Sequence, residues 1–224
     1  MDILLGTGLL VLVLAIFSLF NYKAPHGAKA MGALASAACA SFLVEAFQDS
    51  FFGQVLGFQF LSEVGGANGA LSGVAAAILV AIAIGVSPGY AVLIGLSVSG
   101  TGIIPGFVAG YLVSFLIKWM EKNIPGGLDL IAIIIVGAPL TRFLAQLITP
   151  VINGTLLTIG DILTSSANSN PIIMGMILGG TIVVVATAPL SSMALTAMLG
   201  LTGIPMAIGA LSVFGSSFMN GVLF

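Results

Sequence analysis

The chain has 224 residues, of which 59% are hydrophobic and only 5% are charged, and its formal net charge is −2. A soluble domain carries about 25% charged residues, so this composition excludes a water-soluble fold and predicts an integral membrane protein. No basic patch occurs, which argues against nucleic-acid binding. The 30 glycines and 9 prolines fit helices that pack closely in lipid or are broken within it. We therefore expect an all-α, polytopic membrane protein.

Apolar segments separated by polar, glycine or proline breaks predict about six to eight helices that cross or re-enter the membrane, some of them broken. The first segment follows Asp2 and lacks the basic start of a signal peptide, so we expect it to be retained. The apolar part of residues 48–66 is too short to span a membrane, so we expect an interfacial or re-entrant segment there. In chain order, the expected helical segments cover residues 3–20, 28–47, 68–86, 89–100, 105–119, 129–149, 171–187, 190–200 and 204 onward.

Lysine positions predict the orientation of the chain. Lys23 and Lys29 share one connecting loop, and Lys118 and Lys122 flank another. Because lysine-bearing loops stay in the cytoplasm, both loops are expected to be cytoplasmic and the N-terminus to lie outside. The acidic stretch at residues 45–63 is then expected on the outer side.

Two stretches resemble each other and predict a parallel internal repeat, over residues 67–106 and 167–206. Each begins near an asparagine, continues through an apolar run and a proline break, and ends in a Thr-Gly-Ile-Pro or Thr-Gly-Ile-Ile-Pro motif. The alternative is chance, because membrane helices rich in small residues share a composition. Transporters often contain such repeats, and their binding sites lie where the interrupted helices of the two halves meet.

A polar cluster stands directly before one apolar segment, where Asn168, Ser169 and Asn170 precede Pro171. Capping of the following helix by Ser169 or Asn170 accounts for one polar residue but not for the whole run. Amide groups both donate and accept hydrogen bonds, as sugar hydroxyls require. We therefore expect the cluster to bind a neutral sugar or polyol.

Four further side chains are candidates for this site or its surroundings. Asn68 matches the amide cluster in the other repeat copy, so a cavity shared by the two is expected, and Glu63 precedes it closely. Arg142 interrupts an apolar span, where a charge is costly and often functional. The alternative is a structural role, with carbonyls freed by Pro139 or with Asp161 as its partner. No catalytic motif, metal-ligand spacing or cofactor motif occurs, so we expect no catalytic residue, metal or cofactor.

The segment NSNPIIMG, residues 168–175, resembles the Asn-Glu-Pro signature of the membrane-embedded EIIC components of bacterial phosphotransferase-system sugar transporters. The resemblance extends to the branch that includes perfringolysin-regulator-type proteins. It implies a multi-pass homodimer in the bacterial cell membrane, a sugar substrate, and separate EIIA and EIIB proteins. The phosphoryl donor is then carried by EIIB, so the chain is at most part of a protein-phosphohistidine–sugar phosphotransferase.

One residue departs from that signature, because Asn170 stands where the family has glutamate. An amide orients a hydroxyl but cannot take its proton. Two functions are therefore expected: a sugar permease component, or a membrane-embedded sensor that binds its ligand without phosphorylating it. An ion channel is disfavoured, because no acidic ring or filter motif occurs. We expect one EIIC-like domain over residues 1–224, shortened at its C-terminus compared with the family.

Overall fold

The computed structural model describes residues 2–152, 154, 161–162, 165, 170–187, 208 and 211–212. All regular elements in this part of the chain are helical, which confirms the all-α prediction. The chain divides into two compact units. We call them the terminal unit, Met1–Met31 with Asn153–Phe224, and the central unit, Gly32–Ile152.

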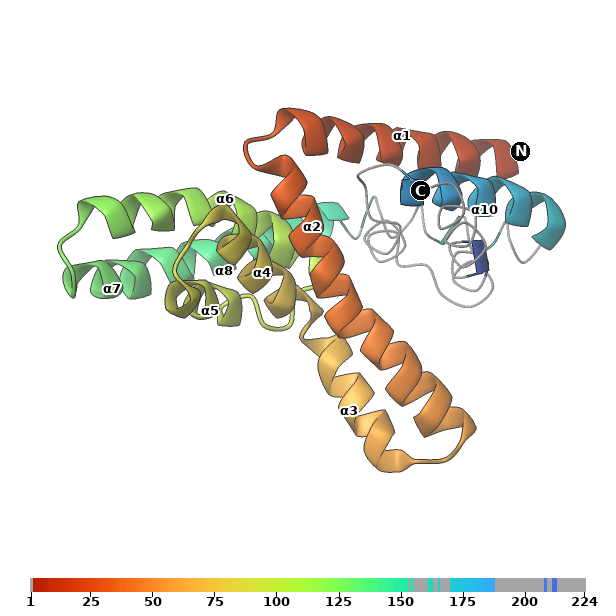
Figure 1. Cartoon of the computed structure of the whole chain (residues 1–224), viewed down its shortest axis with the longest axis horizontal. Coiled ribbons are helices and arrows are strands. Elements are labelled where there is room, and N and C mark those ends of the chain that lie inside the picture. Colours follow the sequence, from red (N-terminus) through yellow and green to blue (C-terminus); the bar gives the residue numbers. More distant parts are fainter. Residues whose placement is uncertain are drawn as a thin grey trace. The chain divides into compact units, whose positions relative to one another are not determined.

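Two long helices are described in the terminal unit, α1 (Asp2–Lys23) and α10 (Pro171–Thr187), and they contact each other (Figure 1). Both are apolar all round, as expected of helices that are surrounded by lipid or protein. Their positions confirm the helices expected over residues 3–20 and 171–187. Helix α2 (Gly27–Ala38) begins directly after α1 and continues into the central unit.

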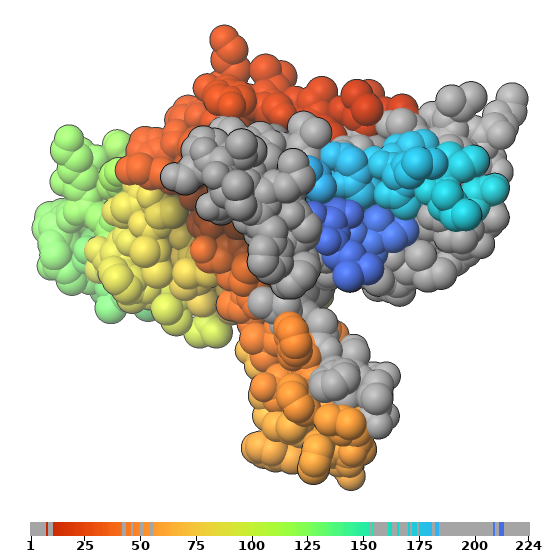
Figure 2. All heavy atoms as spheres, turned by 45° about the vertical axis from the view of Figure 1, so that its right-hand side comes forward, coloured from red at the N-terminus to blue at the C-terminus, as the bar shows by residue number. Residues whose placement is uncertain are grey.

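A helical hairpin opens the central unit (Figure 1). Its first arm is the end of α2 followed by two π-helical segments, η1 (Cys39–Leu43) and η2 (Ala46–Val55). Its second arm is α3 (Gln59–Ala70). In Figure 2 the described side chains of the hairpin, coloured orange, pack against one another.

Glycines bring the two arms of the hairpin together. A Cβ at Gly65 would collide with Asp49 of the opposite arm, and a Cβ at Gly69 would collide with the carboxylate of Glu45. Small residues allow such close approach of helix backbones. The stretch at 48–66 is therefore largely helical, because Gly53 and Gly65 provide packing surface within the arms, and the break lies at the hairpin turn, where Gly57 has a φ of 80°.

Helix α4 (Ser72–Ile84) follows α3 across a bend of 53° at Leu71. The sequence predicted a single helix over residues 68–86, and that prediction is wrong at its start, because the last turn of α3 precedes the bend. The next break agrees with expectation. Gly85, with a φ of 104°, ends α4, and Pro88 opens α5 (Pro88–Leu96).

Helix α6 (Ile103–Asn123) packs parallel along α4, and small residues set their separation. A Cβ at Gly106 would collide with the backbone of Gly73, and one at Gly110 would collide with Ala77. Further along α6, Tyr111 is buried, stacks on Phe107 and meets the Phe115 ring edge-on, whereas Trp119 is exposed near the lysine-bearing end.

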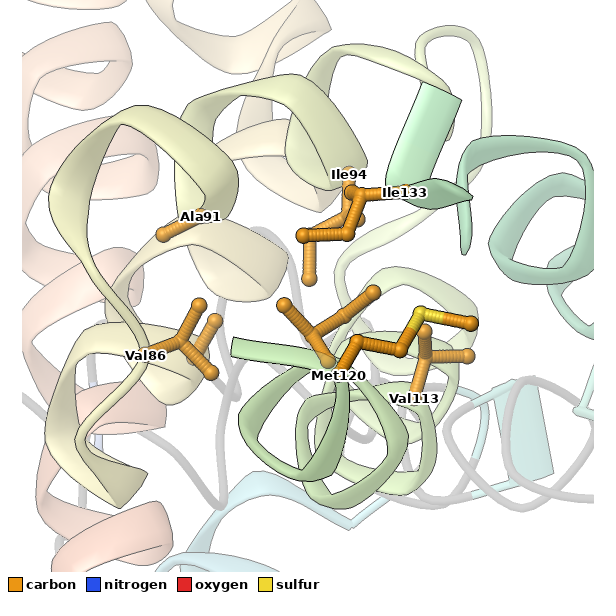
Figure 3. Close-up of a cluster of buried hydrophobic side chains, with 8 residues drawn as sticks. Val86, Ala91, Ile94, Val113, Met120 and Ile133 are labelled. Carbon is orange, nitrogen blue, oxygen red and sulfur yellow. The ribbon is translucent and has the colours of Figure 1, made fainter. Parts of the chain in front are cut away.

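The last elements of the central unit are continuous: α7 (Leu128–Ala132), η3 (Ile133–Gly137) and α8 (Ala138–Ile152). They pack against α5 and α6 around an apolar core (Figure 3). This core consists of Ala81, Val86, Ala91, Ile94, Val113, Ile117, Met120 and Ile133.

By length and composition, two described helices are suited to cross a membrane, Ile103–Asn123 and Leu128–Ile152. The bent pair of α3 and α4 is a third if it forms one span. The expected count of six to eight and the internal repeat stay predictions, because residues 188–207 lie outside the described part of the chain.

Candidate functional site

The bend between α3 and α4 carries the first expected site residue. Asn68 lies in the last turn of α3 and is half-buried, and its Nδ2 donates a hydrogen bond to the carbonyl oxygen of Val64 at 2.9 Å. The backbone N–H of Leu71, at the bend, donates to the carbonyl of Asn68. Glu63 is exposed on the same helix. Of these two α3 side chains, only that of Asn68 lies beside the break at Leu71.

Several polar side chains of the acidic stretch at residues 45–63 lie half-buried between the arms of the hairpin, whereas the sequence predicted only that this stretch marks the outer side. Ser62 donates a hydrogen bond to the Asp49 carboxylate. The Oε1 of Gln48 is buried and has no hydrogen-bond partner in the described part of the chain. The sequence contains a pattern that could have predicted this polar contact between the arms. Glu45 and Asp49 are four residues apart, so they share a helix face. The glycines that meet them on α3 have the same spacing.

The second break, residues 97–102 between α5 and α6, is joined to Arg142. This arginine is half-buried on α8, and its Nη1 donates to the carbonyl oxygens of Ser97 at 3.4 Å and Ser99 at 2.5 Å. The sequence offered carbonyls freed by Pro139, or Asp161, as its partners. The observed acceptors belong to a distant segment, because a turn after a short helix leaves carbonyls without helical partners.

In the terminal unit, Asn170 is exposed immediately before α10, which starts at Pro171. Asp161 is also exposed. Asn168 and Ser169 lie outside the described residues. The expected cavity shared by this cluster and Asn68 would join the two units, so it stays a prediction.

The central unit therefore combines apolar helices with two breaks, each beside a polar group, as expected of membrane proteins that bind a ligand between interrupted helices. The sequence matches the family described as Phosphotransferase system, EIIC, over residues 28–224. The chain belongs to this EIIC family. No curated protein and no solved structure matches it.

Membership makes this EIIC chain a membrane component of a phosphotransferase system. It also points, in general terms, to a sugar substrate and to partnership with EIIA and EIIB proteins. The matched range contains Asn68, Arg142 and Asn170. The resemblance carried by NSNPIIMG is thus confirmed at the level of the family.

Three further polar contacts, made by Lys118, Glu121 and Asp129, hold helix ends at one end of the central unit. Lys118 donates from Nζ to the last carbonyl of α4 at 3.0 Å. The Glu121 carboxylate accepts from the backbone N–H of Ser87 at 3.1 Å, and the Tyr90 hydroxyl donates to Asp129 at 2.7 Å. These contacts fix the start of α5 and the connection between α6 and α7, so we assign them to structure.

Proposed function

We propose that this EIIC chain is the permease component of a phosphotransferase system in the bacterial cell membrane, where it binds and translocates a neutral sugar or polyol. The match of residues 28–224 to the EIIC family carries the proposal. Two features support it: Asn68 beside the bend at Leu71, and the turn between α5 and α6 that Arg142 contacts. In the family such chains form homodimers, and we propose the same assembly here.

The binding chemistry follows from the side chains involved. The proposed binding side chains are uncharged and offer both donors and acceptors, which suits a ligand rich in hydroxyl groups. They are Asn68, Asn168, Ser169 and Asn170. We propose Asn170 as the residue that orients the hydroxyl to be phosphorylated, with EIIB as the phosphoryl donor. An amide cannot remove the hydroxyl proton, and general-base catalysis typically contributes about 10²–10⁴-fold in rate. Phosphorylation by this chain is therefore expected to be slow.

The same residue favours a second candidate function. A sensor that holds its ligand without modifying it needs hydrogen bonds but no base, and Asn170 supplies only the former. The permease and the sensor differ in one measurable quantity, the rate of phosphoryl transfer to a bound ligand.

The reconstituted chain tests the proposal. Binding of a panel of radiolabelled neutral sugars and polyols is measured in vesicles, followed by phosphorylation after addition of phosphorylated EIIB. We expect binding with slow phosphorylation, and we expect Asn170→Asp to accelerate phosphorylation while preserving binding. Fast phosphorylation by the unmodified chain would exclude the sensor. Absence of binding to every member of the panel would contradict both functions.

A matched pair of alanine variants tests the site assignment. Asn170→Ala is expected to weaken ligand binding, because it removes a donor and an acceptor. Asn123→Ala serves as the control, since its exposed amide donates only to the Trp119 carbonyl of its own helix in the described structure. Equal binding by the two variants would remove Asn170 from the site.

A further inference from the structure

The turn between α1 and α2 is short and closely packed. It covers residues 24–26, and α2 begins directly after it at Gly27. The backbone N–H of Gly27 donates to the carbonyl oxygen of Ala24 at 3.0 Å. A Cβ at Gly27 would collide with the carbonyl oxygens of Phe20 and Asn21, near the end of α1. The turn therefore holds the two helix ends in one fixed arrangement.

Basic side chains gather at this turn. Lys23 precedes it and Lys29 follows it, and both are exposed, as is His26 within it. Neither lysine has a hydrogen bond or an ion pair in the part of the chain that the structure describes. The sequence contains no acidic residue between Asp2 and Glu45. The turn therefore presents positive charge that no neighbouring segment neutralises.

Internal structure accounts for other basic residues of the chain, which has only five lysines and arginines. Lys118 donates to the last carbonyl of α4, and Arg142 donates to the turn after α5. Lys122 is exposed at the cytoplasmic end of α6, apart from any second unpartnered lysine of the central unit. Lys23 and Lys29 thus form a pair of cations whose partner lies outside the described chain.

The pair lies where the apolar surface of α1 ends. Large apolar side chains on α1 are more than half exposed up to Leu19, one turn before Lys23. Tyr22, which is 69% exposed, stands between them. Tyrosine and lysine are typical of the boundary between the acyl chains and the headgroups, where an apolar body lies in lipid and a polar tip reaches water. The turn is therefore expected at the depth of the lipid phosphates.

We propose that the turn between α1 and α2 binds the phosphate of an anionic phospholipid in the cytoplasmic leaflet, with Lys23 and Lys29 as the paired cations. The leaflet follows from the cytoplasmic placement of lysine-bearing connections. Ammonium groups form strong, charge-assisted hydrogen bonds to phosphate oxygens. A headgroup matches the size of this turn, whereas a protein partner needs about 800 Å² and 20–30 residues on each side. A zwitterionic lipid binds less well, because its own cation competes for the phosphate.

Quenching by brominated lipids tests the proposal directly. Tyr22→Trp is introduced after Trp119→Phe, which removes the native tryptophan, and the protein is reconstituted in mixtures of phosphatidylcholine and phosphatidylglycerol, one of them brominated. Phosphatidylglycerol is expected to bind beside the new tryptophan about tenfold more strongly than phosphatidylcholine, because two lysines lie near the surface. The preference should decrease as salt screens the charges. Equal quenching by the two lipids, or a preference that salt does not change, would overturn the site.

Charge variants separate this site from a general effect of net charge. Lys23→Gln combined with Lys29→Gln should abolish the preference for phosphatidylglycerol. Lys122→Gln also removes an exposed positive charge and should leave the preference unchanged. An equal loss in Lys122→Gln, or a full preference in the double variant, would contradict the assignment. If the double variant does not fold, Lys29→Gln alone decides, with a loss of several-fold expected and an unchanged preference contradicting the site.

Inorganic phosphate, added at constant ionic strength, distinguishes a lipid from a free anion. We expect it to leave the quenching by brominated phosphatidylglycerol unchanged, because it lacks the acyl chains that keep a lipid headgroup beside the turn. Displacement of the lipid by millimolar phosphate would assign the site to free phosphate and overturn the lipid proposal. The measurement uses neither sugar nor EIIB, so its outcome is independent of the proposed permease function.

Discussion

At Gly106 the absence of a side chain allows two helices to approach closely. A Cβ there would collide with the Gly73 backbone on α4, and the pair lies at the tightest part of the contact between α4 and α6. Glycine in a helix is unfavourable by about 0.5–1 kcal/mol compared with alanine. The close packing that its absence of a side chain allows offsets this cost.

We predict that Gly106→Ala lowers the stability of the protein by about 1–3 kcal/mol, because the added Cβ overpacks the interface. Gly89→Ala is the matched control, since Gly89 is also helical and nothing lies within 4 Å of its added Cβ. Thermal unfolding in detergent should show a lower midpoint for the first variant and an equal or higher midpoint for the second. A similar midpoint for both would show that the close contact contributes nothing.

Residue-scale expectations from the sequence succeeded where chemistry is local and failed where it depends on a distant partner. The break at Pro88 was predictable, because proline and the preceding glycine act on their own backbone. The partner of Arg142 was not predictable from the sequence, because the acceptors at Ser97 and Ser99 belong to a turn whose position depends on the packing of three helices.

At the scale of elements, the hairpin depends on polar contacts as well as glycines. Ser62 on α3 donates to Asp49 on η2, so one hydrogen bond to a carboxylate joins the two arms. Hydrogen bonds to charged groups contribute more than those between neutral groups. The hairpin therefore has a specific register as well as close packing.

We predict that Ser62→Ala lowers stability by about 1–3 kcal/mol, because it leaves a partly buried carboxylate oxygen without this donor. Ser36→Ala provides the control, since the Ser36 hydroxyl donates only to the Gly32 carbonyl of its own helix in the described structure. Chemical denaturation in mixed micelles compares the two. A loss in Ser36→Ala as large as that in Ser62→Ala would contradict a special role for the contact between the arms.

The hairpin also shows why glycine-rich sequence is ambiguous. The run Gly-Gly-Ala-Asn-Gly at residues 65–69 is typical of a break, and the sequence predicted a helix starting near its end. In the structure α3 runs through it, because Gly65 and Gly69 face the opposite arm. Which of these two roles a glycine takes depends on the neighbouring arm, and a single-sequence pattern does not contain that arm.

At the scale of the whole molecule, the central unit has two ends of different character. One carries Lys118 and Lys122 together with the start of α7, and the other carries the tip of the hairpin at Leu56. Lysine-bearing connections remain cytoplasmic. The hairpin tip is therefore expected on the outer side of the membrane.

We predict opposite accessibility for cysteines at the two ends. In the Cys39→Ser background, Lys122→Cys should react with an impermeant thiol reagent in inverted vesicles, and Leu56→Cys should react in right-side-out vesicles. Both side chains are exposed, so burial does not explain a difference. Reaction of both cysteines from the same side would contradict the orientation derived from the lysines.

The brevity of α5 has a consequence for biogenesis. With nine residues it has less than half of the roughly 20 apolar residues that a crossing helix needs, so the insertion machinery has no complete span to recognise when α5 emerges from the ribosome. Its place beside α4 depends on α6, whose end supplies the carboxylate of Glu121 to the backbone at Ser87. Residues 72–123 therefore have to enter the membrane as one unit, and synthesis of α6 is the step that commits α5 to its position.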